Sequence, residues 1–318
     1  MKYLKIDGKQ AAAYALGSAD FGGSISESVS REIMDAYAAL GGNYIDTAHV
    51  YGDFVTPKNG ESEKVIGRWM EDRRNRDQIY LSTKGAHHVL GTRPVGRLSR
   101  DELTRDLNES LEALRTDHID IYWLHRDNPD YTVGEVMETL TGFVEEGRVK
   151  RVGASNWSAA RIREANAYAA SHGLQPFFAN QPQFSLAIQN GPDDPSLVQA
   201  DEDTFLLHAE TGMLMTPFSS QAKGFLTKLD EGGAAALSDK AKRRFYTPEN
   251  LAIYARTKEV SRKTGLSVGA LALLWLTGQD FPVIPIVGAR RPEQLCLLAE
   301  AADASLSRED VRYIRTIT

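Results

Sequence analysis

Short apolar segments rich in strand-forming residues alternate with helix-like patterns along the whole 318-residue chain. In one helical pattern, apolar residues fall at Val29, Ile33, Tyr37 and Leu40, which places them on one face of a helix. Strict alternation predicts parallel strands covered by helices, and eight such units predict a closed barrel, which typically takes about 250 residues. We therefore expect an α/β fold, a (β/α)8 TIM barrel, as a single domain over residues 1–318. The eight strands are expected at Tyr14–Ser18, Tyr44–Asp46, Ile79–Ser82, Ile119–Leu124, Arg151–Ala154, Phe177–Asn180, Gly212–Thr216 and Val283–Ile286.

Three segments exceed what a minimal barrel needs. Lys2–Leu16, with a turn at Asp7-Gly8-Lys9, is typical of an N-terminal β-hairpin. Phe184–Asp203 and Lys223–Pro248 are rich in Gly, Pro, Asp and Gln, and we expect them to form two long loops at the C-terminal face of the barrel. A doubly wound sheet is the alternative fold. It would show a G-x-G-x-x-G fingerprint if it bound a dinucleotide, and the sequence contains none.

The helices between the strands carry recognisable start signals. Ser99 with Glu102, and Thr132 with Glu135, have the spacing of capping boxes ahead of apolar helical patterns. Later helical patterns cover Ile162–Ala169, Phe205–Glu210, Glu249–Thr277 and Val311–Ile317.

Composition excludes several classes of function. The formal charge of −6 and the pI of about 5.7 give no electrostatic footprint for nucleic acid or an anionic membrane surface. Cys296 is the only cysteine, so the chain has no internal disulfide and no multi-cysteine metal site. The N-terminus lacks the apolar core of a signal peptide, and the longest apolar run, Val268–Leu276, is far shorter than the roughly 20 residues of a spanning helix. We expect a cytoplasmic protein without a membrane partner, and the composition is compatible with a homo-oligomer.

Four chemically active side chains follow the ends of neighbouring strands. Asp46 ends the second strand, Tyr51 lies in the loop behind it, Lys84 ends the third strand and His125 ends the fourth. Taken singly, each has an ordinary structural explanation, such as a helix cap, loop packing, a solvated lysine or a core histidine. In a parallel barrel, however, these strand ends share one rim, where active sites form. A phenol has a pKa of about 10, and a lysine ammonium about 4 Å away contributes up to roughly 4 kcal/mol at an effective dielectric constant of about 20. That interaction is large enough to make a tyrosine a working acid.

Several motifs in a fixed order make a family resemblance specific. Asp46-Thr47-Ala48 is followed by Tyr51-Gly52 and Gly60-Glu61-Ser62-Glu63, and later strand ends carry further motifs. These later motifs are Ser82-Thr83-Lys84-Gly85, Tyr122-Trp123-Leu124-His125-Arg126-Asp127, Gly153-Ala154-Ser155-Asn156-Trp157 and Asn180-Gln181-Pro182. Together they resemble the aldo-keto reductases over nearly the whole chain.

The resemblance implies an NADPH-dependent oxidoreductase that reduces an aldehyde or ketone, including sugar-derived carbonyls, to an alcohol. Tyr51 would protonate the carbonyl oxygen as hydride arrives from NADPH, and Lys84 would make that phenol a stronger acid. Asp46 would hold the lysine charged and in place, while His125 would orient the carbonyl by hydrogen bonding. Positioned donors matter most where alkoxide charge develops.

The same resemblance implies where the coenzyme lies. Ser155, Asn156 and Gln181 would hydrogen-bond the nicotinamide carboxamide, and Phe218 would stack on its ring. The run from Ser219 to Gly224 resembles the loop around the pyrophosphate, where backbone N–H groups approach closely. Within it, the binding residues would be Ser219, Ser220, Gln221 and Gly224.

The adenosine end of the coenzyme would meet Gly288, Arg290 and Gln294. Arg290 is placed to bind a 2′-phosphate, which favours NADPH, with NADH as the other coenzyme the family uses. Leu297 and Leu298 stand where the family often has an acid and an asparagine, so we expect adenine to be contacted differently.

Residues around the predicted site leave alternatives open. His87-His88 would either contact substrate or form a solvated pair, and His49 belongs to no His-x-His pair, so we expect no metal. Trp123 and Arg126 flank His125; we expect one of them to face outward into the helices and the other to hold Asp127.

Two other functions compete with the reductase. Lys84 could form a Schiff base in an aldolase-type lyase, and the fold also serves cofactor-sensing regulatory subunits. Because the sequence ends at Thr318, soon after its last helical pattern, we expect no long tail over the site and an open, relatively polar pocket for a small carbonyl substrate.

Overall fold

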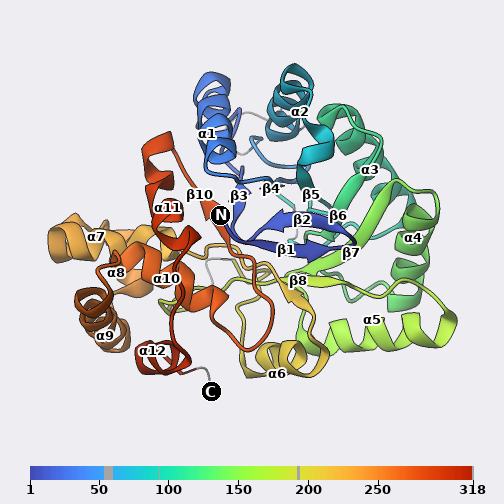
Figure 1. The fold of residues 1–318 in the computed structure, drawn as a ribbon. Coiled ribbons are helices and arrows are strands. Elements are labelled where there is room, and N and C mark those ends of the chain that lie inside the picture. Colours follow the sequence, from blue (N-terminus) through green and yellow to red (C-terminus); the bar gives the residue numbers. More distant parts are fainter. Residues whose placement is uncertain (54–59, 93, 192–193, 317–318) are drawn as a thin grey trace.

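Eight parallel strands form a curled sheet surrounded by helices (Figure 1). The computed structural model describes residues 1–53, 60–92, 94–191 and 194–316. Neighbouring strands follow the order β10-β3-β4-β5-β6-β7-β8-β9. The strands are β3 (Ala15–Gly17), β4 (Tyr44–Asp46), β5 (Tyr80–Gly85), β6 (Ile119–Leu124), β7 (Val149–Ser155), β8 (Ala179–Gln181), β9 (Leu214–Met215) and β10 (Ile286–Gly288). The predicted (β/α)8 architecture is confirmed.

The two edges of the sheet meet at Met215. The backbone N–H of Met215 donates to Pro282 O at 3.0 Å, and its carbonyl accepts from Ile284 N at 2.9 Å. Further along, β10 pairs with β3. The last strand was predicted at Val283–Ile286, but the regular strand β10 covers Ile286–Gly288, and Val283 forms an isolated parallel bridge with Met215. Pro282 and Pro285 lack N–H groups, so the segment before Ile286 cannot form an uninterrupted ladder.

Helices surround the barrel as the sequence pattern requires. Both predicted capping boxes are present, at Ser99 and at Thr132. The α-helices are α1 (Glu27–Ala39), α2 (Glu61–Arg73), α3 (Arg100–Leu114), α4 (Val133–Glu145), α5 (Ala159–His172), α6 (Glu202–Thr211), α7 (Phe225–Gly232), α8 (Asp239–Phe245), α9 (Pro248–Thr264), α10 (Val268–Thr277), α11 (Cys296–Ala302) and α12 (Arg308–Ile314). Short 3-10 helices are η1 (Arg76–Gln78), η2 (Ala222–Gly224), η3 (Gly233–Ala236) and η4 (Pro292–Leu295). The predicted pattern Val311–Ile317 ends as a helix at Ile314, and Ile317 lies outside the described residues. None of the described helices is long and apolar enough to cross a bilayer.

One of the two predicted long loops is mostly helical. The segment Lys223–Pro248 contains α7 and α8 rather than an extended loop. Phe225, Leu226 and Leu229 place a buried apolar stripe on α7, and Ser238 caps α8 by accepting from Ala241 N. The loop prediction was wrong because it followed the glycine-rich composition of the segment, whereas the short apolar repeat determines its helical structure. In the other segment, Phe184–Asp203, the described residues form no helix before Glu202.

The predicted hairpin closes the N-terminal end of the barrel (Figure 1). Strands β1 (Tyr3–Ile6) and β2 (Lys9–Ala12) pair antiparallel, and the turn residues Asp7 and Gly8 have φ values of 50° and 86°. Two positive φ values are the signature of the tight turns that join hairpin strands. Ile6, Ala11 and Ala12 pack against the residues inside the barrel, so the hairpin covers the opening at the N-terminal ends of the strands.

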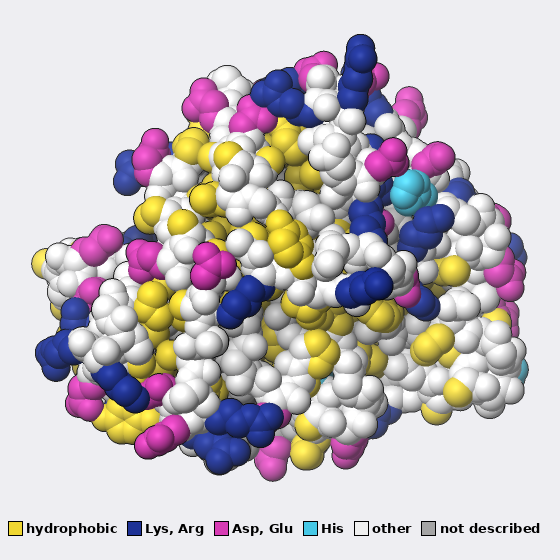
Figure 2. Space-filling view, in the orientation of Figure 1, with side chains coloured by type: hydrophobic (Ala, Val, Ile, Leu, Met, Phe, Trp, Pro, Cys, Tyr) yellow, Lys and Arg dark blue, Asp and Glu magenta, His cyan; other side chains and the backbone are white. Residues whose placement is uncertain are grey.

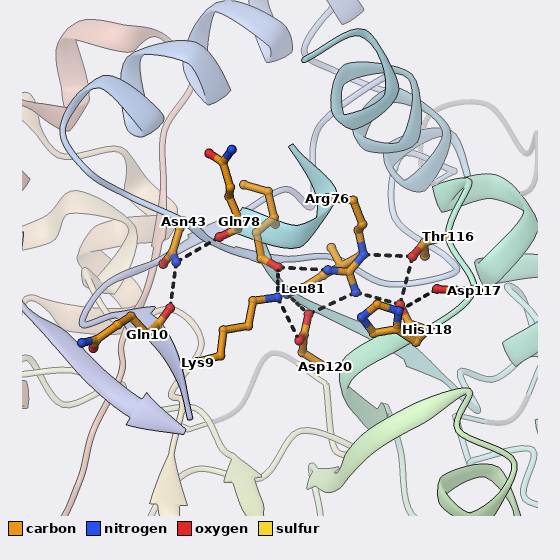
Figure 3. A network of polar contacts seen from close by, with 11 residues as sticks. Lys9, Gln10, Asn43, Arg76, Gln78, Leu81, Thr116, Asp117, His118 and Asp120 are labelled. Carbon is orange, nitrogen blue, oxygen red and sulfur yellow. Dashed lines mark hydrogen bonds and ion pairs between the residues drawn. The ribbon is translucent and has the colours of Figure 1, made fainter. Parts of the chain in front are cut away.

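A polar network joins the hairpin to the N-terminal end of the barrel (Figure 3). Asp120, near the start of β6, contacts Lys9 Nζ and Arg76 Nη2, each at 3.1 Å, and accepts from Leu81 N at 2.9 Å. The surface of the hairpin face carries basic and acidic side chains interspersed with apolar ones (Figure 2).

Side chains inside the barrel alternate with those that face the helices. Tyr80, Ser82 and Lys84 follow one another along β5, while Ile121, Trp123 and His125 follow one another along and just after β6. Because strand side chains repeat with period two, each row keeps one orientation. Both rows begin with apolar residues at the hairpin end, where Tyr80, Ile121 and Trp123 join the inner core, and both end with polar residues at the opposite rim.

Candidate active site

A buried ion pair joins two strand ends at the C-terminal rim. Lys84 Nζ lies 2.5 Å from Asp46 Oδ2 and donates to Thr47 O at 2.6 Å. Ser82 Oγ and Gln181 Nε2 donate to the other carboxylate oxygen of Asp46 at 2.7 and 3.1 Å. The side chains are only 1% and 2% exposed for Lys84 and Asp46. Burial opposes the charged lysine, but the Asp46 carboxylate and the Tyr51 phenol outweigh it and raise the pKa of Lys84. The ammonium therefore stays charged.

Tyr51 lies directly over this ammonium. Lys84 Nζ is 4.6 Å from the centroid of the Tyr51 ring, and a hydrogen bond between the two side chains contributes to the raised pKa of Lys84. The turn that carries Tyr51 is fixed on both sides: Tyr51 N donates to Ala48 O at 3.0 Å, and Ser62 N, at the start of α2, donates to Tyr51 O at 3.1 Å. Local hydrogen bonds thus aim the phenol into the barrel mouth.

His125 completes the group. Its ring is 5.7 Å from that of Tyr51 in an edge-to-face arrangement, and its backbone N–H donates to Gly85 O at 2.9 Å. Its Nδ1 is buried and has no hydrogen-bond partner among the described residues. Burial, together with the nearby His87 ring and Arg126, lowers the pKa of His125 well below its usual range. The imidazole is neutral near pH 7 and can therefore donate one hydrogen bond and accept another.

The strand ends open into a cavity of about 380 Å³. His87 and His88, stacked with ring centroids 4.1 Å apart, form one wall, and the His87 ring meets the His125 ring edge-on at 4.6 Å. His87 is thus a buried wall residue rather than part of a solvated pair. The cavity is lined by Tyr51, His87, His88, Leu90, His125, Arg126, Ser155, Asn156, Gln181, Asp194, Leu197 and Phe218.

Two side chains beside His125 are not where the sequence analysis expected them. Trp123 lies in the core cluster inside the barrel and does not face the helices. Arg126 does not hold Asp127, which instead pairs with Arg161 at 3.4 Å. The alternation of β6 puts Trp123 on the same inward row as His125, and the strand ends before Arg126, so the chain turns this side chain into the cavity.

The residues expected to hold the nicotinamide carboxamide are adjacent in space. Ser155 Oγ donates to Gln181 O at 2.8 Å, and Asn156 Nδ2 donates to His125 O at 3.1 Å. Asn156 has a φ of 59°, and its Oδ1 accepts from Val198 N at 3.0 Å. Phe218 lines the same cavity. All four residues line the cavity, and Gln181 joins this set to the Asp46–Lys84 pair through its bond to Asp46.

The loop expected at the pyrophosphate has an unusual backbone. Ser219, Ala222, Lys223 and Gly224 have φ values of 53°, 48°, 56° and 75°. Backbone segments that combine right- and left-handed residues can form a concavity in which N–H groups face an anion. Ser220 Oγ donates to Ile286 O, which ties the loop to β10, and Gln221 O accepts from Gly224 N at 2.8 Å.

The residues expected at the adenosine end lie beyond β10. Gly288 ends this strand, and Gln294 Oε1 accepts from Arg290 N at 2.7 Å. The Arg290 guanidinium contacts the loop after β3: Nη2 lies 3.3 Å from Ser24 Oγ, and Nη1 lies 3.8 Å from Asp20 Oδ2. Leu298 is fully buried in the core. His49 pairs with Glu109 of α3 at 2.7 Å and is not among the residues that line the cavity.

A parallel barrel with a polar cavity at the carboxyl ends of its strands belongs to the large class of (β/α)8-barrel enzymes. The sequence model described as "Aldo/keto reductase family" matches residues 14–318. The chain is 30% identical to the aldo-keto reductase ausK of Emericella nidulans, in an alignment covering 99% of this chain and 79% of that protein. It is 31% identical to the aryl-alcohol dehydrogenase [NADP(+)] of Phanerodontia chrysosporium (92% and 76% covered) and 26% identical to the norsolorinic acid reductase of Aspergillus flavus (96% and 78% covered).

The chain therefore belongs to the aldo/keto reductase family, and its expected membership is confirmed. Membership makes it an NAD(P)H-dependent oxidoreductase.

The sequence did not predict part of the cavity lining. Leu90, Asp194 and Leu197 come from loops whose approach to the rim has no local signal. Arg126 did have a local signal, because it directly follows a strand-end histidine. The direction of its side chain, however, depends on how the chain leaves β6.

Proposed function

We propose that this protein reduces an aldehyde or ketone to the alcohol with NADPH, and that Tyr51 is the proton donor. The observation that carries the proposal is the position of the Lys84 ammonium, 4.6 Å from the Tyr51 ring centroid and held by Asp46. An ammonium that is buried, charged and adjacent to a phenol stabilises the phenolate that remains after the proton has left.

Each side chain has one role in this scheme. When bound, NADPH supplies a hydride to the carbonyl carbon. Tyr51 gives its hydroxyl proton to the carbonyl oxygen, so the C=O π bond breaks as an O–H bond forms, and water returns a proton to the phenolate. Neutral His125 donates an N–H to the same oxygen and fixes its position. Among the described residues the Asp46 carboxylate contacts Lys84, Ser82 and Gln181, and it therefore acts by positioning Lys84.

The described residues fit a dinucleotide coenzyme. The loop from Ser219 to Gly224, in which four residues are left-handed, suits a pyrophosphate, while Ser155, Asn156, Gln181 and Phe218 line the cavity beside Tyr51. The Arg290 side chain is exposed, and its contacts with Ser24 and Asp20 are long, at 3.3 and 3.8 Å, so its guanidinium can turn to bind a 2′-phosphate. The relative from Phanerodontia chrysosporium is named as an NADP(+) enzyme, which supports the same preference.

The cavity suits a small carbonyl compound. Its lining combines aromatic and imidazole rings with polar groups, and relatives are named for aryl alcohols and for norsolorinic acid. We infer that aromatic aldehydes and ketones are accepted, along with other small carbonyl compounds that include sugar-derived ones.

The Schiff-base alternative fits the site poorly. A lysine that attacks a carbonyl must be uncharged and accessible, whereas Lys84 is 1% exposed, has a raised pKa and is bound by two acceptors. The role of a cofactor-sensing subunit predicts coenzyme binding without turnover, which the following experiment distinguishes.

The replacement Tyr51→Phe tests the proposal. Because it removes only the hydroxyl, kcat for an aromatic aldehyde with NADPH should fall by at least about 100-fold. Coenzyme affinity, measured by quenching of protein fluorescence with NADPH and with NADH, should stay nearly the same. Tyr246→Phe removes the hydroxyl of an exposed tyrosine outside the cavity and is the matched control. Comparable turnover by Tyr51→Phe would rule out Tyr51 as the acid, and no turnover by the wild type would favour the sensing role.

A further inference from the structure

Arg126 brings a buried positive charge to the substrate cavity. The residue is 6% exposed and lines the cavity together with Tyr51 and His125. Its guanidinium donates from Nη1 to His125 O at 2.8 Å and from Nε to Ser196 Oγ at 2.9 Å. These contacts fix the plane of the group. Neither of these bonds uses Nη2, and no hydrogen bond joins Nη2 to a described residue, so this part of the guanidinium is open toward the cavity as far as the described residues go.

No carboxylate of the described residues forms a direct ion pair with Arg126. Burial lowers the pKa of Arg126, and Asp194 is the carboxylate that counteracts this effect. Its hydrogen-bonded link to the guanidinium runs through Ser196: Arg126 Nε donates to Ser196 Oγ, which donates to Asp194 Oδ1 at 2.7 Å. Asp194 also accepts from Ser196 N at 2.8 Å, so this oxygen is already shared. Burial lowers the pKa of Arg126, while Asp194 and Tyr51 oppose that effect, and the guanidinium remains charged.

The other titratable groups of the cavity wall do not supply competing positive charge. Burial lowers the pKa of His87 to about 3, and burial also lowers the pKa values of His88 and His125. Near neutral pH, Arg126 is therefore the one cation among the described cavity-lining residues. A buried charge without a direct counter-ion is unfavourable unless a ligand completes it.

We infer that Arg126 binds an anionic group of the substrate, so that this reductase prefers carbonyl compounds carrying a carboxylate. A planar guanidinium with an open edge matches a carboxylate in two-point contact. Its contact with the carbonyl of His125 fixes it next to the residue that would orient the reacting oxygen. The anionic group must then lie within one small ring or a short chain of the reacting carbonyl. This inference rests on the proposed carbonyl reduction and specifies its substrate class.

Two substrates that differ only in charge test the inference. 4-Carboxybenzaldehyde and its methyl ester share the reacting aldehyde and the ring, and the 3-carboxy isomer with its ester samples a second distance. A hydrogen-bonded charge pair of this kind is worth about 10–100-fold in binding. The wild type should therefore favour the acid over the ester in kcat/KM by about this factor, mainly through KM.

Variants of Arg126 assign the preference to its charge. Arg126→Met keeps much of the apolar stem and should lower the ratio of acid to ester to about one, while Arg126→Lys should restore part of it. Arg308→Met removes the same net charge at an exposed site outside the cavity lining and should leave the ratio unchanged. Melting temperature and coenzyme binding would show that each variant is folded.

Each outcome decides a separate claim. Equal kcat/KM for acid and ester in the wild type would overturn the inference. An equal loss for both substrates in Arg126→Met would also overturn it, because Arg126 would then support the chemistry of Tyr51 rather than bind the carboxylate. If the wild type reduces neither aldehyde, the proposed reduction fails. Calorimetric titration with benzoate then still tests Arg126: binding that is lost in Arg126→Met supports the anion site, and identical heats in both proteins refute it.

Discussion

Asp46 and Asp120 are buried carboxylates of the same sheet, at opposite ends of the barrel. Asp46 ends β4 at the rim of the cavity, and Asp120 lies at the start of β6 beside the hairpin. Each pairs with a lysine, Lys84 at 2.5 Å and Lys9 at 3.1 Å. The two clusters use the same chemical groups and differ in what those groups contact.

At the hairpin end, the donors are used to join segments of the chain (Figure 3). Lys9 Nζ also donates to Ile79 O at 2.6 Å, and Arg76 donates to Thr116, Ile79 and His118 besides contacting Asp120. The hairpin, η1, β5 and β6 are thereby fastened together. At the rim, Lys84 faces the Tyr51 ring, and the cavity lies beyond it. Identical residue types thus stabilise the fold at the amino ends of the strands and are available for chemistry at their carboxyl ends.

Replacement of Lys84 by Met should have the largest effect and should alter both activity and stability. Losing the cation beside Tyr51 should lower kcat by at least about 100-fold. It also leaves Asp46 buried without its counter-ion, which should cost about 3–5 kcal/mol in the free energy of unfolding. Aldehyde turnover and urea denaturation measure the two effects.

The double variant Asp46→Asn/Lys84→Met separates these effects. With both charges removed, stability should largely return, because no uncompensated charge remains. Turnover should not return, since the ammonium is still absent. Recovery of turnover together with stability would show that the pair only supports the fold, as the cluster at the hairpin end does.

Asp120→Ala should have the opposite profile. It leaves Lys9 and Arg76 without their carboxylate and the Leu81 N–H without its acceptor, and we expect a loss of about 2–3 kcal/mol in the free energy of unfolding. The loss is moderated because the Lys9 side chain is 28% exposed. The kcat of the folded fraction should be unaffected. Asp117→Ala, which removes a carboxylate that is 95% exposed in the same network, is the matched control and should change stability little. A large fall in kcat for Asp120→Ala would break the contrast between the two ends.

The sequence predicted the rim cluster but not the cluster at the hairpin end, and the reason is physical. Asp46, Lys84 and His125 each end an apolar strand, and parallel strands bring their carboxyl ends together whatever the loops do. Asp120 meets Lys9 across 111 positions of the chain. That contact depends on how the hairpin folds under the barrel, which no local pattern encodes.

The same distinction explains the other differences. Strands and capped helices were predicted because their apolar periods are local, as at Ser99 and Thr132. Helix α7 was missed because its apolar stripe is short and glycine-rich sequence surrounds it. The direction of Arg126 was missed because a side chain just beyond a strand end no longer obeys the alternation of the strand. The roles assigned to the individual cavity residues stay predictions until the variants are measured.

The rim should also make stability depend on pH, with a smaller effect than either charge deletion. His87 is buried beside His88 and His125, and burial lowers its pKa from 6.5 to about 3. Below pH 6.5 the unfolded chain therefore binds a proton that the folded protein does not, so stability is full above pH 6.5 and is lost as the pH falls toward about 3. At pH 5 the loss from this one group should be roughly 2 kcal/mol.

His87→Phe retains a ring in the stack but cannot bind a proton, so its stability should fall less than that of the wild type between pH 7 and pH 5. Urea denaturation at both pH values measures the difference. His88→Phe is the matched comparison and should change the pH dependence less, because burial lowers the pKa of the more exposed His88 in the same direction but less strongly. His125 keeps its own buried imidazole in both variants, so some acid sensitivity should persist. If His87→Phe and the wild type lose equal stability between pH 7 and pH 5, burial of the neutral His87 ring does not make the rim sensitive to acid.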